Sequence, residues 1–251
     1  MPIFPRQRQL ADAISHRRLD ALVVTHLPNI RYLTGFTGSA AVLILGPGFK
    51  PIFITDGRYT SQAREQVEGA RIVISKLPAL DAAAEQLNRL KLKSVGIEAD
   101  YMPVSQRTRF NKLTKSKLKE TSGLVERIRL IKDAAELAAL RRAVQLGADL
   151  FEVALKTIKP GIRETEVAAE LEYAARRRGA EAMSFQTIVA SGPRSALPHG
   201  VASGARIPAR GFVVLDYGVI LGGYCSDMTR TVHVGRPSPE ARRWYNAVLE
   251  S

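Results

Sequence analysis

Two aspartates, Asp216 and Asp227, are the residues whose type and spacing point most directly to chemistry. Asp216 ends the apolar run 212–215, and Asp227 follows soon after a pair of glycines. Two strand-like stretches joined by a glycine-containing turn predict a β-hairpin. If the turn is centred between Leu221 and Gly222, the two aspartates lie directly opposite each other, with Cβ atoms about 4.5–5.5 Å apart.

Two carboxylates held that close beside apolar residues repel each other, and little water reaches them. Either one of them stays protonated or a cation binds between them. We favour a pair of divalent cations, because carboxylate oxygens are hard ligands. Thr229 shares the face of Asp227, since strand side chains alternate, and its hydroxyl can orient a ligand carboxylate. The competing interpretation is that Asp216 and Asp227 are turn and edge residues facing water.

His199 is the next candidate for a functional side chain. It lies in a loop, Ser195 to Gly200, and loops on a rigid scaffold commonly carry function, although a lone loop histidine is more often a surface residue. A Ser–His hydrolase has little support, because no G-x-S-x-G turn frames Ser191 or Ser195. His233 shares the face of Asp227, but six strand residues separate the two by about 20 Å.

The elements that must position these residues change in pattern near residue 124. In the first part, short apolar strands alternate with helical patterns. The predicted strands are 20–25, 40–45, 51–55, 71–75 and 94–98, and the predicted helices are 5–18, 57–67, 79–91 and 103–113. This alternation predicts an α/β domain over residues 1–124, in which helices cover a sheet.

Residues 125–251 indicate an α+β domain. Asp133 and Glu136 form a capping-box pattern in front of a long helix. We expect the apolar stripe of this helix to comprise Leu137, Leu140, Val144, Ala148, Phe151 and Leu155. Further elements are a helix at 163–178, strands at 187–190, 212–216 and 224–234, and a final helix capped by Ser238. That helix has no stop signal before Ser251, so we expect the second domain to be truncated.

Composition narrows the class of protein further. The 251 residues are 45% hydrophobic with a net charge of +13, which excludes a disordered chain. We expect neither a membrane span nor a secretory signal, and a single cysteine, Cys225, fits a reducing, cytoplasmic setting. The densest basic cluster, at 107–119, has only Phe110 as an aromatic neighbour, so we favour a solvated helix and loop edge over a nucleic-acid site.

Several stretches together resemble the Xaa-Pro peptidase family, the prolidases and aminopeptidases P with a pita-bread catalytic fold. In the second half, these are the segments around His199, Asp216 and Asp227, with the sequences LPHG, VLDYG and SDMTRT. In the first half, the segments 32–39 and 55–60 resemble the creatinase-like N-terminal domain of the same family. The stretch from Arg129 to Asp133, with Glu136, resembles the usual entry into the catalytic domain.

The resemblance implies a site with two divalent cations, commonly manganese and sometimes cobalt or zinc. Asp216 would bind one metal, Asp227 would bridge both, and His199 would contact the substrate near the scissile carbonyl. The reaction would be hydrolysis of the peptide bond preceding proline, by an Xaa-Pro aminopeptidase or dipeptidase. The substrate would be a peptide with proline at the second position, and a homodimer is the family expectation.

The family's site takes five metal ligands, and its histidine and two glutamates follow the second aspartate. After Asp227 the sequence offers only His233, Glu240 and Glu250, and none of them is suitably placed. We therefore expect these 251 residues alone to bind metal weakly and to be inactive. Two alternatives stay open: a non-catalytic pita-bread homologue that binds protein or nucleic acid, and a metal-free creatinase-type amidinohydrolase. We expect both of these to lack one or both of Asp216 and Asp227.

Overall fold

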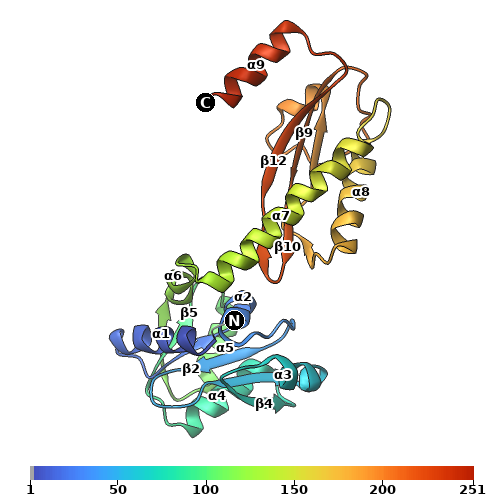
Figure 1. The fold of residues 1–251 in the computed structure, drawn as a ribbon. Coiled ribbons are helices and arrows are strands. Elements are labelled where there is room, and N and C mark those ends of the chain that lie inside the picture. Colours follow the sequence, from blue (N-terminus) through green and yellow to red (C-terminus); the bar gives the residue numbers. More distant parts are fainter. Residues whose placement is uncertain (1–2) are drawn as a thin grey trace. The chain divides into compact units, whose positions relative to one another are not determined.

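Residues 3–251 are described in a computed structural model (Figure 1). The chain forms two compact units, and the division falls between Lys132 and Asp133. The sequence-based division at 124/125 stays a prediction of domain organisation. Residues 125–132 contribute to the first unit, because Val125 is buried in its core. Within the described residues, no helix combines the length and apolar character needed to cross a membrane.

The first unit is built on a six-stranded mixed sheet in the order β4-β3-β2-β1-β5-β6. Its strands are β1 (Ala21–Val24), β2 (Val42–Leu45), β3 (Ile52–Asp56), β4 (Arg71–Ser75), β5 (Ser94–Glu98) and β6 (Lys117–Thr121). Its helices are α1 (Ile3–His16), α2 (Leu27–Thr34), the 3-10 turn η1 (Gly57–Tyr59), α3 (Thr60–Gln66), α4 (Ala79–Arg89), α5 (Val104–Leu113) and α6 (Leu124–Leu130). The β1–β2 and β2–β3 pairs are antiparallel and the remaining pairs are parallel.

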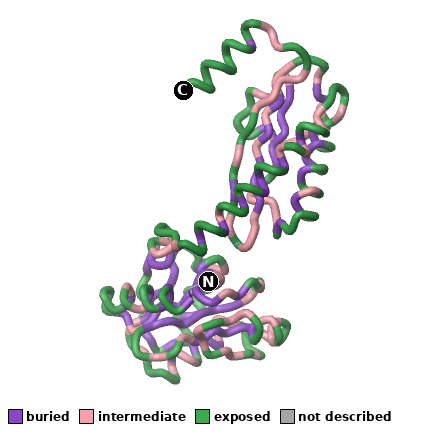
Figure 2. The backbone as a smooth tube through the Cα atoms, in the orientation of Figure 1, coloured by how far each residue is buried: buried purple, intermediate pink, exposed green. Residues whose placement is uncertain are grey.

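Both faces of this sheet are covered, which explains why its central strands are apolar without alternation. In β1, Leu22 and Val24 belong to one core with residues of α1 and α6. Ala21 and Val23 belong to the other core, with residues of α4 and α5. The central strands are accordingly buried along their length (Figure 2). This is the α/β layer that the sequence predicts.

Two elements of the first unit differ from the sequence-based expectation. The end of the basic cluster, residues 117–119, is solvated as expected but belongs to the edge strand β6 rather than to a helix or loop: Lys117 and Lys119 face outward, while Leu118 packs on the core. The short helix α2, which the sequence did not predict, has a proline in its first turn. It ends at Gly35, whose φ is +83°.

The second unit is α+β, as expected. Its helices are α7 (Ala134–Thr157), α8 (Glu164–Arg177) and α9 (Pro239–Leu249), with a 3-10 segment η2 (Gly192–Ala196). Its strands are β7 (Ala182–Met183), β8 (Ile188–Ser191), β9 (Gly211–Tyr217), β10 (Val219–Leu221), β11 (Tyr224–Cys225) and β12 (Met228–Val234). They form two antiparallel sheets, β12-β9-β8 and β11-β10-β7. Along β9, Val213, Leu215 and Tyr217 share a core with α7 and α8, which leaves the opposite face of β9 open.

The long helix α7 begins as predicted, but it buries a different face. Asp133 and Glu136 form both hydrogen bonds of the capping box. The predicted apolar stripe is wrong in large part, because Leu137, Val144 and Leu155 are 44%, 56% and 42% exposed, although Phe151 packs against the core. The face that packs is made mainly of small residues and leucines: Ala139, Ala143, Leu146, Gly147, Leu150 and Ala154. Small residues let α7 lie close to the strands, where the Tyr217 hydroxyl donates to the Gly147 carbonyl at 3.1 Å.

Candidate functional site

The hairpin that carries the two aspartates has a different register from the expected one. Asp216 on β9 pairs with Thr229 on β12 rather than with Asp227. The turn consists of Gly222 and Gly223, with φ of +60° and +81°, and Leu221 pairs with Tyr224. Its centre lies one position later than predicted, because two residues with positive φ form a tight two-residue turn that matches the strand twist. Each cross-strand partner therefore shifts by two residues.

Asp227 lies beside Gly218, where the two halves of the hairpin approach very closely. A Cβ atom on Gly218 would lie 1.9 Å from the Ser226 carbonyl oxygen and 3.1 Å from the Asp227 Cα. The Ser226 amide and hydroxyl continue the pairing, because both hydrogen bond to the backbone of Val219. Only glycine allows this approach, so residue type at 218 determines how near Asp227 comes to β9.

Thr229 contacts one of the two aspartates, Asp216. Its hydroxyl donates to Asp216 Oδ1 at 3.0 Å. Asp227 lies two residues before Thr229, in the break between β11 and β12. Asp216 is half-buried, whereas Asp227 and Thr229 are exposed. The hairpin thus carries both aspartates, and a hydroxyl is bonded to one of them.

The loop that carries His199 lies against β8, the strand next to β9. Ile188 on β8 pairs with Asp216, and on its other side it forms a bridge with Val201, two residues after His199. Gly200 packs against the same strand, since a Cβ on Gly200 would lie 2.7 Å from the Ala190 Cβ. The side chain of His199 is exposed. The fold therefore places the histidine loop at the strand that adjoins Asp216.

The donor chemistry of this site suits part of the coordination of a divalent cation. Two carboxylates, one of them oriented by a threonine hydroxyl, are hard oxygen ligands. Among residues 3–251, however, no group of three or more histidine, cysteine, aspartate and glutamate side chains could hold a metal ion. His233 lies away from the pair, where its ring packs edge-to-face on Phe212 at 5.2 Å. Among the described residues, the two aspartates can therefore supply only part of a metal ion's ligands.

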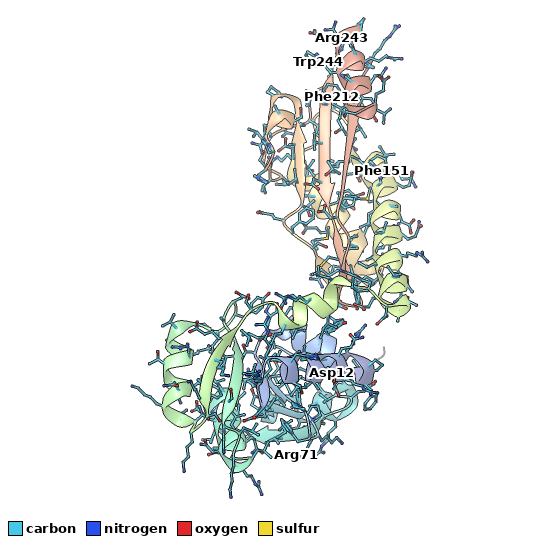
Figure 3. The ribbon with its side chains drawn as sticks, turned by 90° about the vertical axis from the view of Figure 1, so that its left-hand side faces the viewer. Asp12, Arg71, Phe151, Phe212, Arg243 and Trp244 are labelled. Carbon is cyan, nitrogen blue, oxygen red and sulfur yellow. The ribbon has the colours of Figure 1, made fainter. Side chains whose placement is uncertain are left out.

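A groove of about 630 Å³ lies beside Thr229, the cross-strand partner of Asp216. Thr229 and Thr231 of β12 line it together with Phe212 and Val214 of β9. The aromatic residue Trp244 of α9 lines the same groove, and it lies at the same end of this unit as Phe212 (Figure 3). Of these residues, only Thr229 is assigned to the site from sequence. The sequence does carry one sign of the groove: by strand alternation along β9, Phe212 and Val214 lie on the same face as Asp216.

Comparisons with known proteins identify the family of both units. Residues 6–131 match the creatinase/prolidase N-terminal domain, and residues 138–251 match metallopeptidase family M24. The chain is 32% identical to an Xaa-Pro dipeptidase of Pyrococcus horikoshii over 97% of its length and 68% of the relative's. It is 40% identical to the uncharacterized peptidase YqhT of Bacillus subtilis, covering 93% of this chain and 66% of that protein. A solved Xaa-Pro dipeptidase from Bacillus anthracis superposes with a TM-score of 0.94 at 40% identity, covering 99% of this chain and 70% of that one.

These matches define a two-domain metallopeptidase, with a creatinase-like domain followed by a pita-bread domain. The chain belongs to metallopeptidase family M24, among the Xaa-Pro peptidases. It spans about two thirds of the length of the curated relatives that it matches.

Proposed function

We propose that the whole protein hydrolyses the peptide bond preceding proline in a metal-dependent reaction, as an Xaa-Pro dipeptidase or aminopeptidase. The observation that carries this proposal is the pairing of Asp216 with Thr229, which donates to that carboxylate and lines an apolar groove. Asp227 lies two residues earlier in the chain. A family that includes Xaa-Pro dipeptidases supports it independently.

Asp216 and Asp227 would hold two divalent cations, with manganese the favoured ion and cobalt or zinc the alternatives. The cations would lower the pKa of bound water and polarise the scissile carbonyl. The Thr229 hydroxyl fixes the orientation of one carboxylate by donating to it. His199 would contact the substrate near the scissile carbonyl and donate to the developing negative charge. The groove beside Phe212 and Val214 offers apolar surface for a proline ring.

The rest of the assignment is also proposed. The substrate is a peptide with proline at its second position, the protein acts in the cytoplasm, and it forms a homodimer. Residues 1–251 by themselves bind metal weakly and are inactive, because two carboxylates are fewer ligands than the five that the family's site takes. A non-catalytic binding homologue and a metal-free creatinase-type amidinohydrolase are disfavoured by the presence of both Asp216 and Asp227.

A manganese titration tests this proposal. We expect Mn²⁺ to stabilise the whole protein against heat and to support cleavage of Xaa-Pro peptides. Asp216→Asn and Asp227→Asn should each remove both effects, because an amide is a poorer ligand than a carboxylate. Asp149→Asn on α7 makes the same chemical change at an exposed position and serves as the matched control. A wild-type protein that neither binds Mn²⁺ nor cleaves these peptides would contradict the proposal.

A further inference from the structure

The carboxylate of Glu164 is fully buried, although no step proposed above uses it. Glu164 is the first residue of α8, and its side chain has no exposed surface. Carboxylates are seldom buried completely unless other groups neutralise or hydrogen bond to them. Glu164 must therefore have partners that compensate for the loss of water around its carboxylate.

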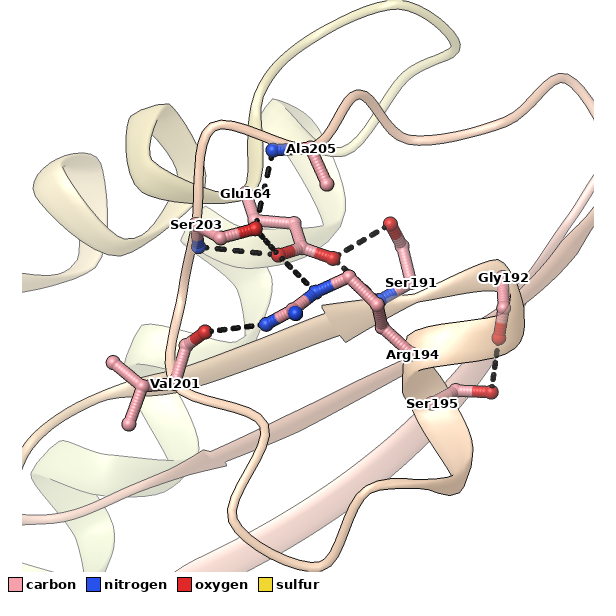
Figure 4. Close-up of polar contacts among 8 residues, drawn as sticks. All are labelled: Glu164, Ser191, Gly192, Arg194, Ser195, Val201, Ser203 and Ala205. Atoms are coloured by element: carbon pink, nitrogen blue, oxygen red, sulfur yellow. Dashed lines mark hydrogen bonds and ion pairs between the residues drawn. The ribbon is translucent and has the colours of Figure 1, made fainter.

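Five hydrogen bonds reach Glu164 from one stretch of chain (Figure 4). The Ser191 amide and hydroxyl donate to Oε1 at 2.8 and 2.9 Å. The Ser203 amide and hydroxyl donate to Oε2 at 3.1 and 2.7 Å. Arg194 Nε also donates to Oε2, at 3.1 Å. Both ends of the segment 191–203 thus converge on one carboxylate.

This segment is the loop that carries His199. Within it, Arg194 also donates through Nη2 to the Val201 carbonyl at 2.8 Å, which ties the two sides of the loop together. The Val201 amide donates to the His199 carbonyl at 2.9 Å. The backbone on both sides of His199 is therefore connected to Arg194, and Arg194 is connected to Glu164.

The hydrogen bonds keep Glu164 ionised despite its burial. Burial by itself opposes ionisation, but the donors from Ser203 and Ser191 outweigh it and lower the pKa of Glu164. The start of α8 also favours a negative charge through the helix dipole. A charged, fully bonded carboxylate is a rigid anchor, because losing any donor leaves a buried charge less satisfied.

We propose that Glu164 is a positioning residue for His199: it fixes both ends of the 191–203 loop so that the imidazole is held beside the strand that adjoins Asp216. This inference rests on the proposed function for its catalytic consequence. Its structural part, the ordering of the loop by Glu164, can be measured without any reaction.

Hydrogen exchange tests the structural part on the metal-free chain. Glu164→Gln keeps the shape of the side chain but replaces one acceptor oxygen with an amide nitrogen. This nitrogen would donate toward groups that are themselves hydrogen-bond donors. We expect the amides of Ser191, Ser203 and the residues around His199 to exchange about tenfold faster or more. Glu170→Gln is the matched control, because it changes the same charge at an exposed position of the same helix. If Glu164→Gln does not fold, Ser203→Ala takes its place. It removes one donor to Glu164, so we expect it to accelerate exchange by a smaller factor.

Kinetics of the metal-loaded whole protein test the catalytic part. A displaced His199 should lower kcat for an Xaa-Pro peptide by about 10- to 100-fold, while KM changes by less than about threefold. If Glu164 acts through the histidine, the double variant Glu164→Gln/His199→Gln should be no slower than His199→Gln alone. A purely structural role would slow both backgrounds by the same factor.

The possible results separate the two proposals. A wild-type protein without hydrolysis would overturn the proposed function, and the exchange rates would still decide whether Glu164 orders the loop. Unchanged exchange in both Glu164→Gln and Ser203→Ala would overturn the inference, even in an active enzyme. Equal slowing by Glu164→Gln in the presence and absence of His199 would overturn the positioning role.

Discussion

At the residue scale, Thr229 is the contact that restrains the Asp216 carboxylate. Its hydroxyl donates to Oδ1 at 3.0 Å, and Asp216 is only half-buried, so few other groups limit its rotation. Replacing Thr229 by valine keeps the shape and removes the donor. We expect Thr229→Val to weaken Mn²⁺ binding by the whole protein about 10-fold or more, as measured by calorimetry.

Thr231→Val is the control for that experiment. Thr231 lies two residues along the same face of β12 and pairs with Val214, an apolar residue. Both threonines line the groove, so the two variants change its polarity equally. Equal losses of Mn²⁺ affinity in both would contradict a specific role for the Thr229 hydroxyl.

The buried carboxylate of Glu164 gives the second unit a defined response to acid. Its pKa is lowered from the ordinary value of 4.5: burial opposes ionisation, but the hydrogen bonds from Ser203 and Ser191 outweigh it. A lowered pKa means that the ionised group stabilises the fold fully above pH 4.5. This stabilisation disappears as the pH falls further, through the folded-state pKa.

The measurement is the melting temperature of the wild type minus that of Glu164→Gln, across a pH series. We expect a positive difference that is constant above about pH 5.5 and that shrinks below about pH 4.5. A difference that stays constant into the acid range would show that the charge of Glu164 does not contribute to stability.

At the element scale, the choice of packed face on α7 is the clearest test of the fold. Leu150 is fully buried and Leu155, five residues later, is 42% exposed. We expect Leu150→Ala to lower the free energy of unfolding by about 2–5 kcal/mol. Leu155→Ala, the same substitution on the other face, should cost less than about 1 kcal/mol. Urea denaturation of both variants gives the comparison, and similar losses would mean that the packed face is wrongly assigned.

Local signals on the second unit could be predicted from sequence, whereas long-range packing could not. The Asp133–Glu136 capping box and the Ser238 cap depend only on residues three apart, and both are present. The packed face of α7 depends on what lies opposite it. Spacing of large apolar residues selects Leu137 and Val144, but a close approach to the strands requires Ala143 and Gly147 instead.

The candidate site shows the same limit. Residue types and spacing predict the hairpin, the two aspartates and the shared face of Thr229. The register could not be predicted, since moving the turn centre by one residue moves each partner by two, and only the pair of positive φ angles at Gly222 and Gly223 determines it. The groove could not be predicted because it combines β9 and β12 with Trp244 from a helix beyond the strands.

At the scale of the whole molecule, the segment 125–132 decides where the first domain can be cut. Val125 is 1% exposed in the core of the first unit. The side chain of Asn29 donates to Glu126 at 2.6 Å and accepts from Arg129 at 2.8 Å. These contacts lie beyond the sequence-based boundary at residue 124.

We expect residues 1–132 to unfold cooperatively on their own, and residues 1–124 to be less stable by at least about 2 kcal/mol, because the shorter piece lacks the burial of Val125. Thermal denaturation followed by circular dichroism compares the two pieces. Equal stability would place 125–132 outside the folding unit and support the boundary at 124/125.

Gly218 determines more than the path of the backbone. Because only a hydrogen atom fits between residue 218 and the Ser226 carbonyl, the two halves of the hairpin cannot slide past each other without bringing a side chain into that contact. Gly218 therefore limits the registers in which the segment carrying Asp227 can pair with the segment that follows Asp216, so this one glycine helps to determine which residues lie across from β9.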